Sequence, residues 1–503
     1  MGSYATSFIW ITITLLIAYF IFVIWLGKKG AVHSRTLVGF TIAKGKVNPW
    51  IVGMSFGASY ASANLFLGVP GWAYTYGYSA LWWTLGCFGV SWFGLLLFGK
   101  TFWKYGQKNG GVVTLPEWLG SRYKSSTIRV LVALLILFNV YYIVGQNVGL
   151  ATMFETIIGI PYTWGVVLGV VITILYVGWG GAFAQLVSDG IQGIIMSITS
   201  VVIFVSLLWT IGGGLGVFGK LQGQLASASP QLLSATSTSD GPFSSGFSIL
   251  SIQWLLFSFV LLPHLMNKIL TLDDAKQLRP FTLSAGISLF LLSTLTVFAG
   301  LAARVILPNL DAADKAIPLY LIEAFHPIVV AIMVTGIISA ILSTTDSLYL
   351  GISSSIGNDL FKPLVGPFLL KNKHVTEGIV DDRAMKISKY SLILIGVASL
   401  YLSIERPESL ALLTQFGTSA IISGIVAPIA LGYFWPYANK YGAIASVIGG
   451  AGLYIILTSL GIVENLFIAL FYGSIFGFLT MVTVCLGTQP AVKRKLKYAS
   501  TNS

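Results

Sequence analysis

Charged residues are scarce in this sequence: they make up 9% of its 503 residues, whereas hydrophobic residues make up 55%. A soluble domain carries about 25% charged residues, so a soluble globular fold is excluded. Cysteine is nearly absent too, and the two present, Cys87 and Cys485, lie in apolar stretches. A disulfide framework is therefore excluded. The segments between the apolar stretches are too short for a nucleotide-binding domain. We therefore expect that any process driven by this chain draws its energy from an ion or solute gradient rather than from nucleotide hydrolysis.

Apolar stretches of the length that crosses a bilayer, roughly 20 residues, recur along the whole chain. We count about thirteen, at 7–26, 50–74, 80–103, 130–158, 163–177, 182–211, 249–269, 280–307, 327–358, 387–403, 408–434, 442–460 and 466–486. The sequence thus predicts an all-α polytopic membrane protein with about thirteen transmembrane helices. The longest segments between them, 212–246 and 361–386, are predicted as an external loop and a cytoplasmic linker.

The 29 lysines and arginines fall mainly on one side of this topology. Only four lie in loops of the other side, namely Lys220, Arg304, Lys315 and Arg406, and the remaining 25 include Lys268. The positive-inside rule places the basic side in the cytoplasm, so we expect a plasma-membrane protein with its N-terminus outside and its C-terminus in the cytoplasm. The net charge of +12 is then explained by basic loops at anionic membrane lipid, and no nucleic-acid partner is expected.

Small residues crowd the centre of the second stretch, GMSFGASYASANLFLGVPG at 53–71. They are Gly53, Ser55, Gly57, Ala58, Ser59, Ala61, Ser62 and Ala63. This composition permits close helix packing or an unwound helix whose freed carbonyls coordinate a cation. Tyr60, Ser62 and Asn64 add hydrogen-bonding groups at mid-depth.

An aspartate follows a glycine-rich turn in the segment YVGWGGAFAQLVSDGIQGII at 176–195. Gly178, Gly180 and Gly181 are typical of a tight turn between two spans, and Asp189 lies about two helical turns beyond it. A carboxylate at that depth needs a partner. The partner is either a bound cation or a structural hydrogen bond from nearby hydroxyls.

Hydroxyls form a stripe in TGIISAILSTTDSLYLGISSSIGNDL at 335–360. Ala340, Ser343, Thr344 and Ser347 have the i, i+3, i+4, i+7 spacing of one helix face. Oxygen ligands of this kind suit a hard cation such as sodium, although membrane serines also bond only to their own helix. Asp346 lies just off the stripe and either completes a second cation site or faces another helix.

Together these segments resemble the sodium/solute symporter family. The resemblance rests on GASYASANLFLGVPG, on the glycine pair followed by Asp189 and Gln192, and on STTDS with SSSIGNDLF. It spans about residues 50–434. It implies a leucine-transporter-like core of two inverted repeats of five helices, 48–213 and 248–434, within one membrane-embedded domain, 1–503. An extra helix and cytoplasmic loop (1–47), two C-terminal helices (435–487) and a cytoplasmic tail (488–503) complete the expected organisation.

The resemblance also implies sodium ligands by position. The main site would use the carbonyls of Ala58, Ala61 and Ala340 and the hydroxyls of Ser343 and Thr344. A second sodium site, present in some relatives, would use Asp189, Ser343, Asp346 and Ser347. Sodium ion is the only cofactor expected.

The solute is expected near the bilayer midplane. The predicted contacts are Tyr60, Ser62, Asn64, Gln146, Leu255, Phe259 and Gln415. Gln146 and Gln415 serve equally well as interhelical hydrogen-bonding residues. Tyr60 stands where the family's proline permease has an acidic residue, and Phe259 replaces a gating aromatic that bears a hydroxyl. No lysine or arginine is predicted at mid-depth, so we expect a small monocarboxylate, amino acid or similar compact polar solute.

The resulting prediction is a sodium-coupled symporter that imports a small molecule by alternating access and is not an enzyme. A proton-coupled or sodium-independent carrier on the same fold is the alternative, because a buried carboxylate such as Asp189 also carries protons. An intramembrane aspartyl protease using Asp189 and Asp346 is disfavoured, because the glycine-flanked motif expected around the second aspartate is missing. The sequence makes no prediction about oligomeric state.

Overall fold

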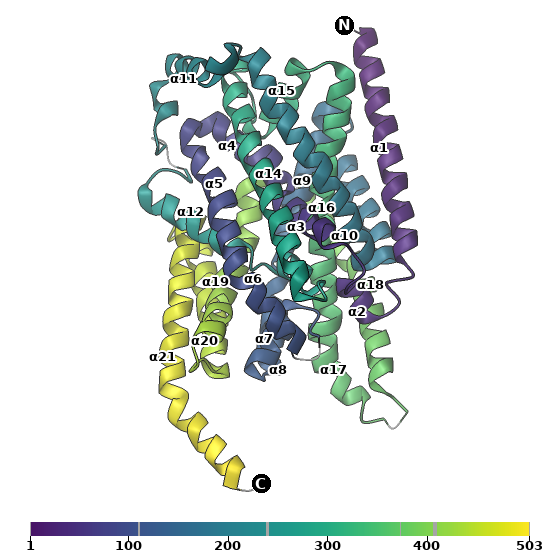
Figure 1. Ribbon diagram of the computed structural model, residues 1–503, viewed down its shortest axis with the longest axis vertical. Coiled ribbons are helices and arrows are strands. Elements are labelled where there is room, and N and C mark those ends of the chain that lie inside the picture. The colour runs from purple at the N-terminus through teal and green to yellow at the C-terminus, as the bar shows by residue number, and fades with distance from the viewer. Residues whose placement is uncertain (1, 109–110, 238–240, 373, 406–409, 502–503) are drawn as a thin grey trace.

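The computed structural model describes residues 2–108, 111–237, 241–372, 374–405 and 410–501, and its regular elements in these ranges are all helical (Figure 1). The first half contains α1 (Gly2–Gly30), α2 (Leu37–Ile42), α3 (Pro49–Ala63), α4 (Val69–Tyr76), α5 (Leu81–Leu85), α6 (Ser91–Lys108), α7 (Leu115–Tyr123), α8 (Ser126–Ile136), α9 (Asn139–Met153), α10 (Tyr162–Thr210) and α11 (Val217–Ala228). The second half contains α12 (Gly246–Phe259), α13 (Pro263–Leu270), α14 (Leu278–Ile306), α15 (Ala316–Ala324), α16 (Pro327–Ser355), α17 (Lys362–Leu369), α18 (Glu377–Ile404), α19 (Leu410–Phe434), α20 (Lys440–Ser459) and α21 (Leu466–Thr501).

Large apolar side chains cover the outside of the helical bundle, and hydroxyls lie inside it. Trp10, Trp164 and Tyr401 are 64%, 63% and 76% exposed, whereas Ser343 and Thr344 are fully buried. This arrangement suits a hydrocarbon solvent, because in lipid every polar group has to find its partner within the protein. The surface is therefore that of a membrane-spanning protein.

The chain reverses within the 60-residue range Pro49–Lys108. Before Gly77, residues later in the chain contact later residues of α14. After Gly77, residues later in the chain contact earlier residues of α14. The contacting pairs are Gly57 with Ser288, Pro70 with Gly300, Thr84 with Ser293 and Trp92 with Thr282. Gly77 has φ of +66°, a conformation that glycine adopts without steric cost. Two antiparallel segments therefore pack on α14.

A second reversal divides α10 at Gly181, where φ is +54°. Tyr176 lies against Gly27 of α1, whereas Gln192 donates a hydrogen bond to Tyr19 of the same helix. A straight helix would separate Tyr176 from Gln192 by about 24 Å, but their α1 partners are only about 12 Å apart along the axis. The predicted turn between two spans is thus confirmed.

Eleven ranges of the described chain are long and apolar enough to cross a membrane. The two ranges that reverse each contain two of the thirteen predicted windows. The number thirteen is not confirmed, because the eleven ranges rest on length and composition alone, and it stays a prediction. The predicted loops also contain helices: α11 lies within 212–246 and α17 within 361–386, and α21 continues past 488 to Thr501.

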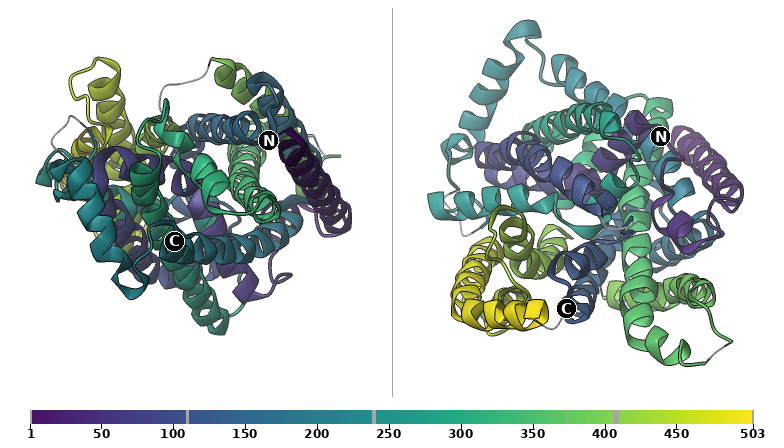
Figure 2. Two further views of the ribbon diagram at one scale, coloured as in Figure 1. Left: turned by 90° about the horizontal axis from the view of Figure 1, so that it is seen from above. Right: turned by 60° about the horizontal axis from the view of Figure 1, so that its bottom comes forward.

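The two ends of the bundle differ in the segments they carry. α1 begins at the upper end in Figure 1, the end that also carries α11 and α15, whereas α7, α8, α17 and the end of α21 lie at the lower end. The segments predicted as external and cytoplasmic are therefore separated in space. Figure 2 shows that α20 and α21 stand on the opposite side of the bundle from α1. The helices between them, chiefly α3, α10, α14 and α16, position the site.

Candidate functional site

The second predicted span is interrupted at Ser62, whose φ of +53° and ψ of +176° are not helical. A regular helix would pair the Ala63 N–H with the Ser59 carbonyl. Instead, the Ala63 N–H donates to Gln146 Oε1 at 2.8 Å, and the Ser59 carbonyl accepts from the Thr344 hydroxyl at 3.0 Å. The interruption implied by the family resemblance is therefore present, and it frees a carbonyl toward α16.

Hydroxyls of α16 face the carbonyls released by this interruption. The Ser343 hydroxyl lies 3.2 Å from the Ala58 carbonyl and 2.7 Å from the Ala340 carbonyl. With Ser59 and Thr344, these groups bring five oxygens from two helices into one buried place. The sequence had not indicated the Ser59 carbonyl. The Ala61 carbonyl accepts the Asn64 N–H, and its role as a sodium ligand stays a prediction.

Close packing explains the glycines that precede the interruption. A β-carbon at Gly53 would collide with Ser284 and Phe281 of α14, and one at Gly57 would collide with Ser288. Packing and unwinding, which the sequence left as alternatives, therefore both occur in this span. Packing occupies its first half, and the interruption follows at Ser62.

Asp189 pairs with a lysine that the sequence had placed in a cytoplasmic loop. Lys268, on α13, lies 2.7 Å from Asp189 Oδ2, and the two side chains are 3% and 0% exposed. The prediction that Lys268 belongs to a cytoplasmic loop is therefore wrong. The hydrophobic window ended at residue 269, and the lysine near its end is drawn inward by a buried carboxylate.

Two further helices, α3 and α16, and Gln185 of α10 contribute to the Asp189–Lys268 pair. The Lys268 ammonium donates to the hydroxyls of Ser55 and Ser59, both at 2.6 Å. The Ser347 hydroxyl lies 2.7 Å from that of Ser59. Gln185 donates to both Ser347 and Asp189. Asp189 thus has both kinds of partner that the sequence left open, a cation and structural hydroxyls, but here the cation is a side chain of the same chain.

Asp346 faces another helix rather than the hydroxyl stripe. Its Oδ2 accepts a hydrogen bond from the Tyr176 hydroxyl of α10. Its Oδ1 and the Oδ1 of Asp189 are both buried and have no hydrogen-bond partner among the described residues. We name Asp189, Asp346 and Lys268 the charged cluster.

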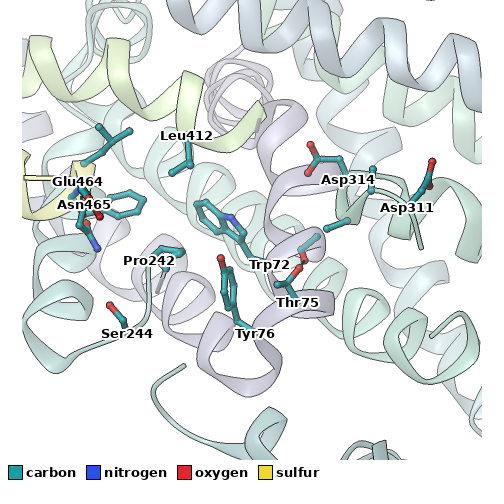
Figure 3. Close-up of a pocket in the computed structure, with 16 residues that line it drawn as sticks. Trp72, Thr75, Tyr76, Pro242, Ser244, Asp311, Asp314, Leu412, Glu464 and Asn465 are labelled. Atoms are coloured by element: carbon teal, nitrogen blue, oxygen red, sulfur yellow. Dashed lines mark hydrogen bonds between the residues drawn. The ribbon is translucent and has the colours of Figure 1, made fainter. Parts of the chain in front are cut away.

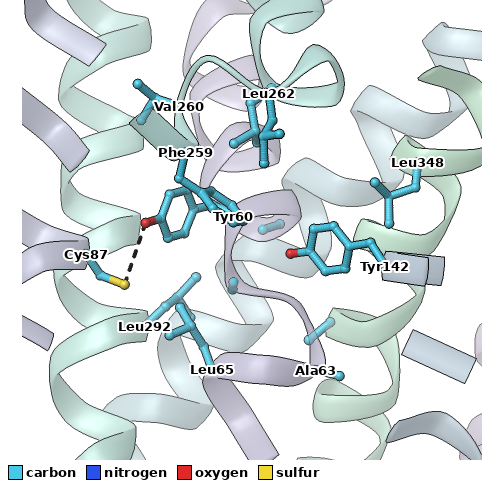
Figure 4. Close-up of a cluster of buried hydrophobic side chains, with 14 of the residues drawn as sticks. Tyr60, Ala63, Leu65, Cys87, Tyr142, Phe259, Val260, Leu262, Leu292 and Leu348 are labelled. Carbon is cyan, nitrogen blue, oxygen red and sulfur yellow. Dashed lines mark hydrogen bonds between the residues drawn. The ribbon is translucent and has the colours of Figure 1, made fainter. Parts of the chain in front are cut away.

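A small cavity of about 10 Å³ lies beside the interruption. Figure 4 shows the rings of Tyr60, Phe259 and Tyr142 around the interrupted backbone. The predicted residues Tyr60, Ser62, Asn64 and Phe259 line the cavity. This volume holds about one water molecule, so a solute needs a rearrangement to enter.

The other predicted solute residues lie apart from the cavity lining. Leu255 is buried, but its neighbour Leu256 lines the cavity. Gln146 binds the Ala63 N–H and leaves its Nε2 without a described partner. Gln415 accepts from Thr418 of its own helix. Gln415 is not among the described residues that line the cavity, and its role stays a prediction.

Two aromatic residues of the cavity were missed by the sequence reasoning. Trp83 and Tyr142 line it with the predicted residues. Tyr142 is one helical turn before Gln146, so the i, i+4 spacing could have indicated it. Trp83 belongs to the next span, and no sequence pattern connects it to Ser62.

A larger cavity of about 670 Å³ opens toward the upper end of the bundle. Figure 3 shows Trp72 and Tyr76 in its wall, with the carboxylates of Asp311, Asp314 and Glu464 farther out. Trp72 contacts Trp83, with ring centroids 5.0 Å apart. Because Trp72 lines the large cavity and Trp83 the small one, this pair separates the two cavities.

An ion-pair network lies at the lower end of the bundle. Arg129 lies 2.8 Å from Asp359 and 3.1 Å from Glu117. The Thr114 hydroxyl donates to Asp359 at 2.9 Å, and Asn358 donates to Glu117 at 3.2 Å. Asn358 and Asp359 of the SSSIGNDLF motif thus bind residues of α7, of α8 and of the segment just before α7.

Comparisons with known proteins agree with this geometry. The family model described as the sodium:solute symporter family matches residues 40–450. A sodium/pantothenate symporter of Haemophilus influenzae is 30% identical over 93% of this chain and 92% of its own length, and one of Escherichia coli is 28% identical over 82% of each chain. A Na⁺-coupled sialic acid symporter has a similar structure, with a TM-score of 0.76, 18% identity and coverage of 94% of this chain and 97% of the other. The chain belongs to the sodium:solute symporter family.

Proposed function

We propose that this chain imports pantothenate, or a hydroxylated monocarboxylate close to it, together with sodium. Its membership of the family makes it a sodium-coupled symporter rather than an enzyme. The relatives named above as sodium/pantothenate symporters support the choice of solute. The observation that carries the proposal is the interruption at Ser62, which joins a set of oxygens to a neutral cavity.

The proposed sodium site uses oxygens from α3 and α16 at the place where these two helices meet. The ligands are the carbonyls of Ala58, Ser59 and Ala340 and the hydroxyls of Ser343 and Thr344. Carbonyl and hydroxyl oxygens suit a hard cation, and a sodium ion would replace the hydrogen bonds between them. Binding at this place draws α3 toward α16, because each helix supplies part of the coordination.

The solute part of the proposal rests on unpaired amide groups near the interruption. Gln146 Nε2 and Asn64 Oδ1 are buried and have no hydrogen-bond partner among the described residues. A buried polar group left unpaired costs about 1–3 kcal/mol, so a solute that pairs both gains affinity. Pantothenate offers a carboxylate and an amide carbonyl as acceptors, and hydroxyls and an amide N–H as donors.

The charge of a monocarboxylate is met without a basic residue in the cavity lining. The helical backbone restarts after Ser62, and the N-terminal end of a helix favours an anion. The sodium site lies on the other side of the same interruption, so its positive charge also favours the anion. This arrangement couples solute affinity to sodium, and the coupling is reciprocal.

Alternating access follows from the positions of the two barriers. The Trp72–Trp83 pair lies above the small cavity, and the Arg129–Asp359 pair closes the lower end. We propose that sodium and solute bind from the upper end, that the two repeats at 48–213 and 248–434 rearrange around them, and that the lower barrier then opens.

The proposed orientation places the upper end outside the plasma membrane. It is supported by the basic residues predicted for the cytoplasmic side and by the separation of α11 from α17 in space. A single cysteine at exposed Lys220 should react with a membrane-impermeant thiol reagent in intact cells, whereas one at Lys371 should react only after lysis. The opposite labelling pattern would reverse the orientation.

Uptake into proteoliposomes tests the proposed function. Labelled pantothenate should accumulate under an inward sodium gradient and should be displaced by unlabelled pantothenate but not by proline or sialic acid. Displacement by proline alone would contradict the solute. Accumulation under a proton gradient without sodium would contradict the coupling ion and favour the proton-coupled alternative.

A further inference from the structure

Lys268 fills the place at which the family resemblance implies a second sodium ion. The second site was expected around Asp189, Ser343, Asp346 and Ser347. In the structure the Lys268 ammonium binds Asp189 Oδ2 at 2.7 Å and also the Ser55 carbonyl at 3.1 Å. Of the residues implied for the second site, the Lys268 ammonium binds Asp189, and an ammonium group and a sodium ion cannot both bind Asp189 Oδ2 at once. The residues present therefore do not fit a second sodium ion at this oxygen.

Charge balance also favours one bound sodium ion rather than two. The charged cluster contains two buried aspartates and one buried lysine, so one negative charge is left over when all three side chains are ionised. Uncompensated charge inside a membrane protein is costly. Before the monocarboxylate solute binds, one sodium ion at the neighbouring main site balances this charge, whereas two would leave an excess positive charge.

Ser59 connects the two positive charges. Its carbonyl accepts from Thr344 at the proposed main sodium site, and its hydroxyl accepts from Lys268 at 2.6 Å. The cluster and the sodium site are therefore adjacent, and the same short segment of α3 belongs to both.

We propose that Lys268 is a resident cation that replaces the second sodium ion, so that this symporter binds and moves one sodium ion per cycle. The inference rests on the proposed main sodium site. The proposal adds the number of sodium ions moved per cycle, which the main site alone does not determine. It also assigns the buried pair a role in ion stoichiometry.

The number of bound ions in the purified wild-type protein tests the proposal directly. Radioactive sodium bound at saturation should reach about one ion per protein, and the sodium dependence of thermal stability should follow a single site. Two ions per protein would overturn the inference while the proposed sodium site stands. No bound sodium would instead contradict that site.

Removing the resident cation should create a second site. In Lys268→Gln the two carboxylates remain, so bound sodium should rise to about two ions, and the Hill coefficient of the sodium-dependent stabilisation should rise from about 1 toward 2. The matched control is Asp189→Asn combined with Lys268→Gln, which removes one charge of each sign. This double variant should again bind one ion.

The outcomes separate the alternatives even if one variant is unstable. A single ion in Lys268→Gln would show that the lysine does not stand in for sodium and would overturn the proposal. If Lys268→Gln does not fold, the wild-type count and the charge-balanced double variant decide, because the proposal requires one ion in each and fails if either binds two.

Discussion

The side chain of Gln146 accepts a hydrogen bond from the backbone N–H of Ala63 at 2.8 Å. This contact joins α9 to the end of the interrupted α3, at the place where a helical hydrogen bond is missing. The Gln146 Nε2 is buried and has no hydrogen-bond partner among the described residues. One side chain therefore stabilises the interruption and, in the proposed function, offers a donor to the solute.

Replacing Gln146 by leucine should weaken solute binding. The change leaves the Ala63 N–H unpaired and removes the free amide donor, which together cost about 1.5–3 kcal/mol, or more than about ten-fold in the Kd for solute. Asn147→Leu is the matched control, because Asn147 is equally buried on α9 but its side chain donates a hydrogen bond to Ser403 of α18. Equal losses of pantothenate binding in the two variants, measured by calorimetry, would make Gln146 a structural residue only.

Removing a hydroxyl from the proposed sodium site should weaken sodium activation. Ser343→Ala and Thr344→Ala each remove one oxygen ligand, and we expect the sodium concentration for half-maximal uptake to rise about ten-fold or more. Thr345→Ala is the control, because the Thr345 hydroxyl bonds only to the Ile341 carbonyl of the same helix, at 2.7 Å. Wild-type sodium dependence in both site variants would contradict the assignment.

Opening the upper barrier should expose a native thiol. Cys87 is buried, and its thiol lies 3.6 Å from the Tyr60 hydroxyl beside the small cavity. In a Cys485→Ser background, Trp72→Ala should raise the labelling rate of Cys87 by a water-soluble thiol reagent several-fold. Trp164→Ala, at a residue 63% exposed on the outer surface, should leave the rate unchanged. An unchanged rate in Trp72→Ala would mean that this side chain is not the barrier.

Breaking the lower network should destabilise the closed protein. Asp359→Asn removes the charge that faces Arg129, at 2.8 Å and with the aspartate fully buried. Because Arg129 keeps Glu117 as a partner, we expect a loss of about 1–3 kcal/mol, seen as a lower thermal midpoint. Asp382→Asn breaks an exposed pair with Lys386 and should change stability by less than about 1 kcal/mol. The prediction fails if the two midpoints shift equally.

The sequence predicted the all-helical fold and the segments that meet at the site, because long apolar windows and the hydroxyl stripe are local patterns. Ser343 and Thr344 face α3 as their spacing indicates. The turn at Gly181 was also predictable, since consecutive glycines favour a positive φ. The position of the interruption was not, because Ser62 adopts a positive φ that its residue type does not suggest.

The residues that were missed depend on tertiary contacts. Lys268 lies at the end of an apolar window, and a charge count assigns such a residue to the nearest loop. Only the position of α13 beside Asp189 shows that the ammonium points inward. Trp83 reaches the cavity because the chain reverses at Gly77, and the geometry of that reversal cannot be derived from composition.

The glycines at 53 and 57 restrict how this transporter changes shape. With no space for even a methyl group between them and α14, the first half of α3 cannot slide along its neighbour, so the two helices have to travel as one unit. Ser62 then becomes the pivot between that unit and α4. A bulky residue at Gly57 would force α3 and α14 apart. It would impair the conformational change of the transporter without contacting the proposed sodium or solute site.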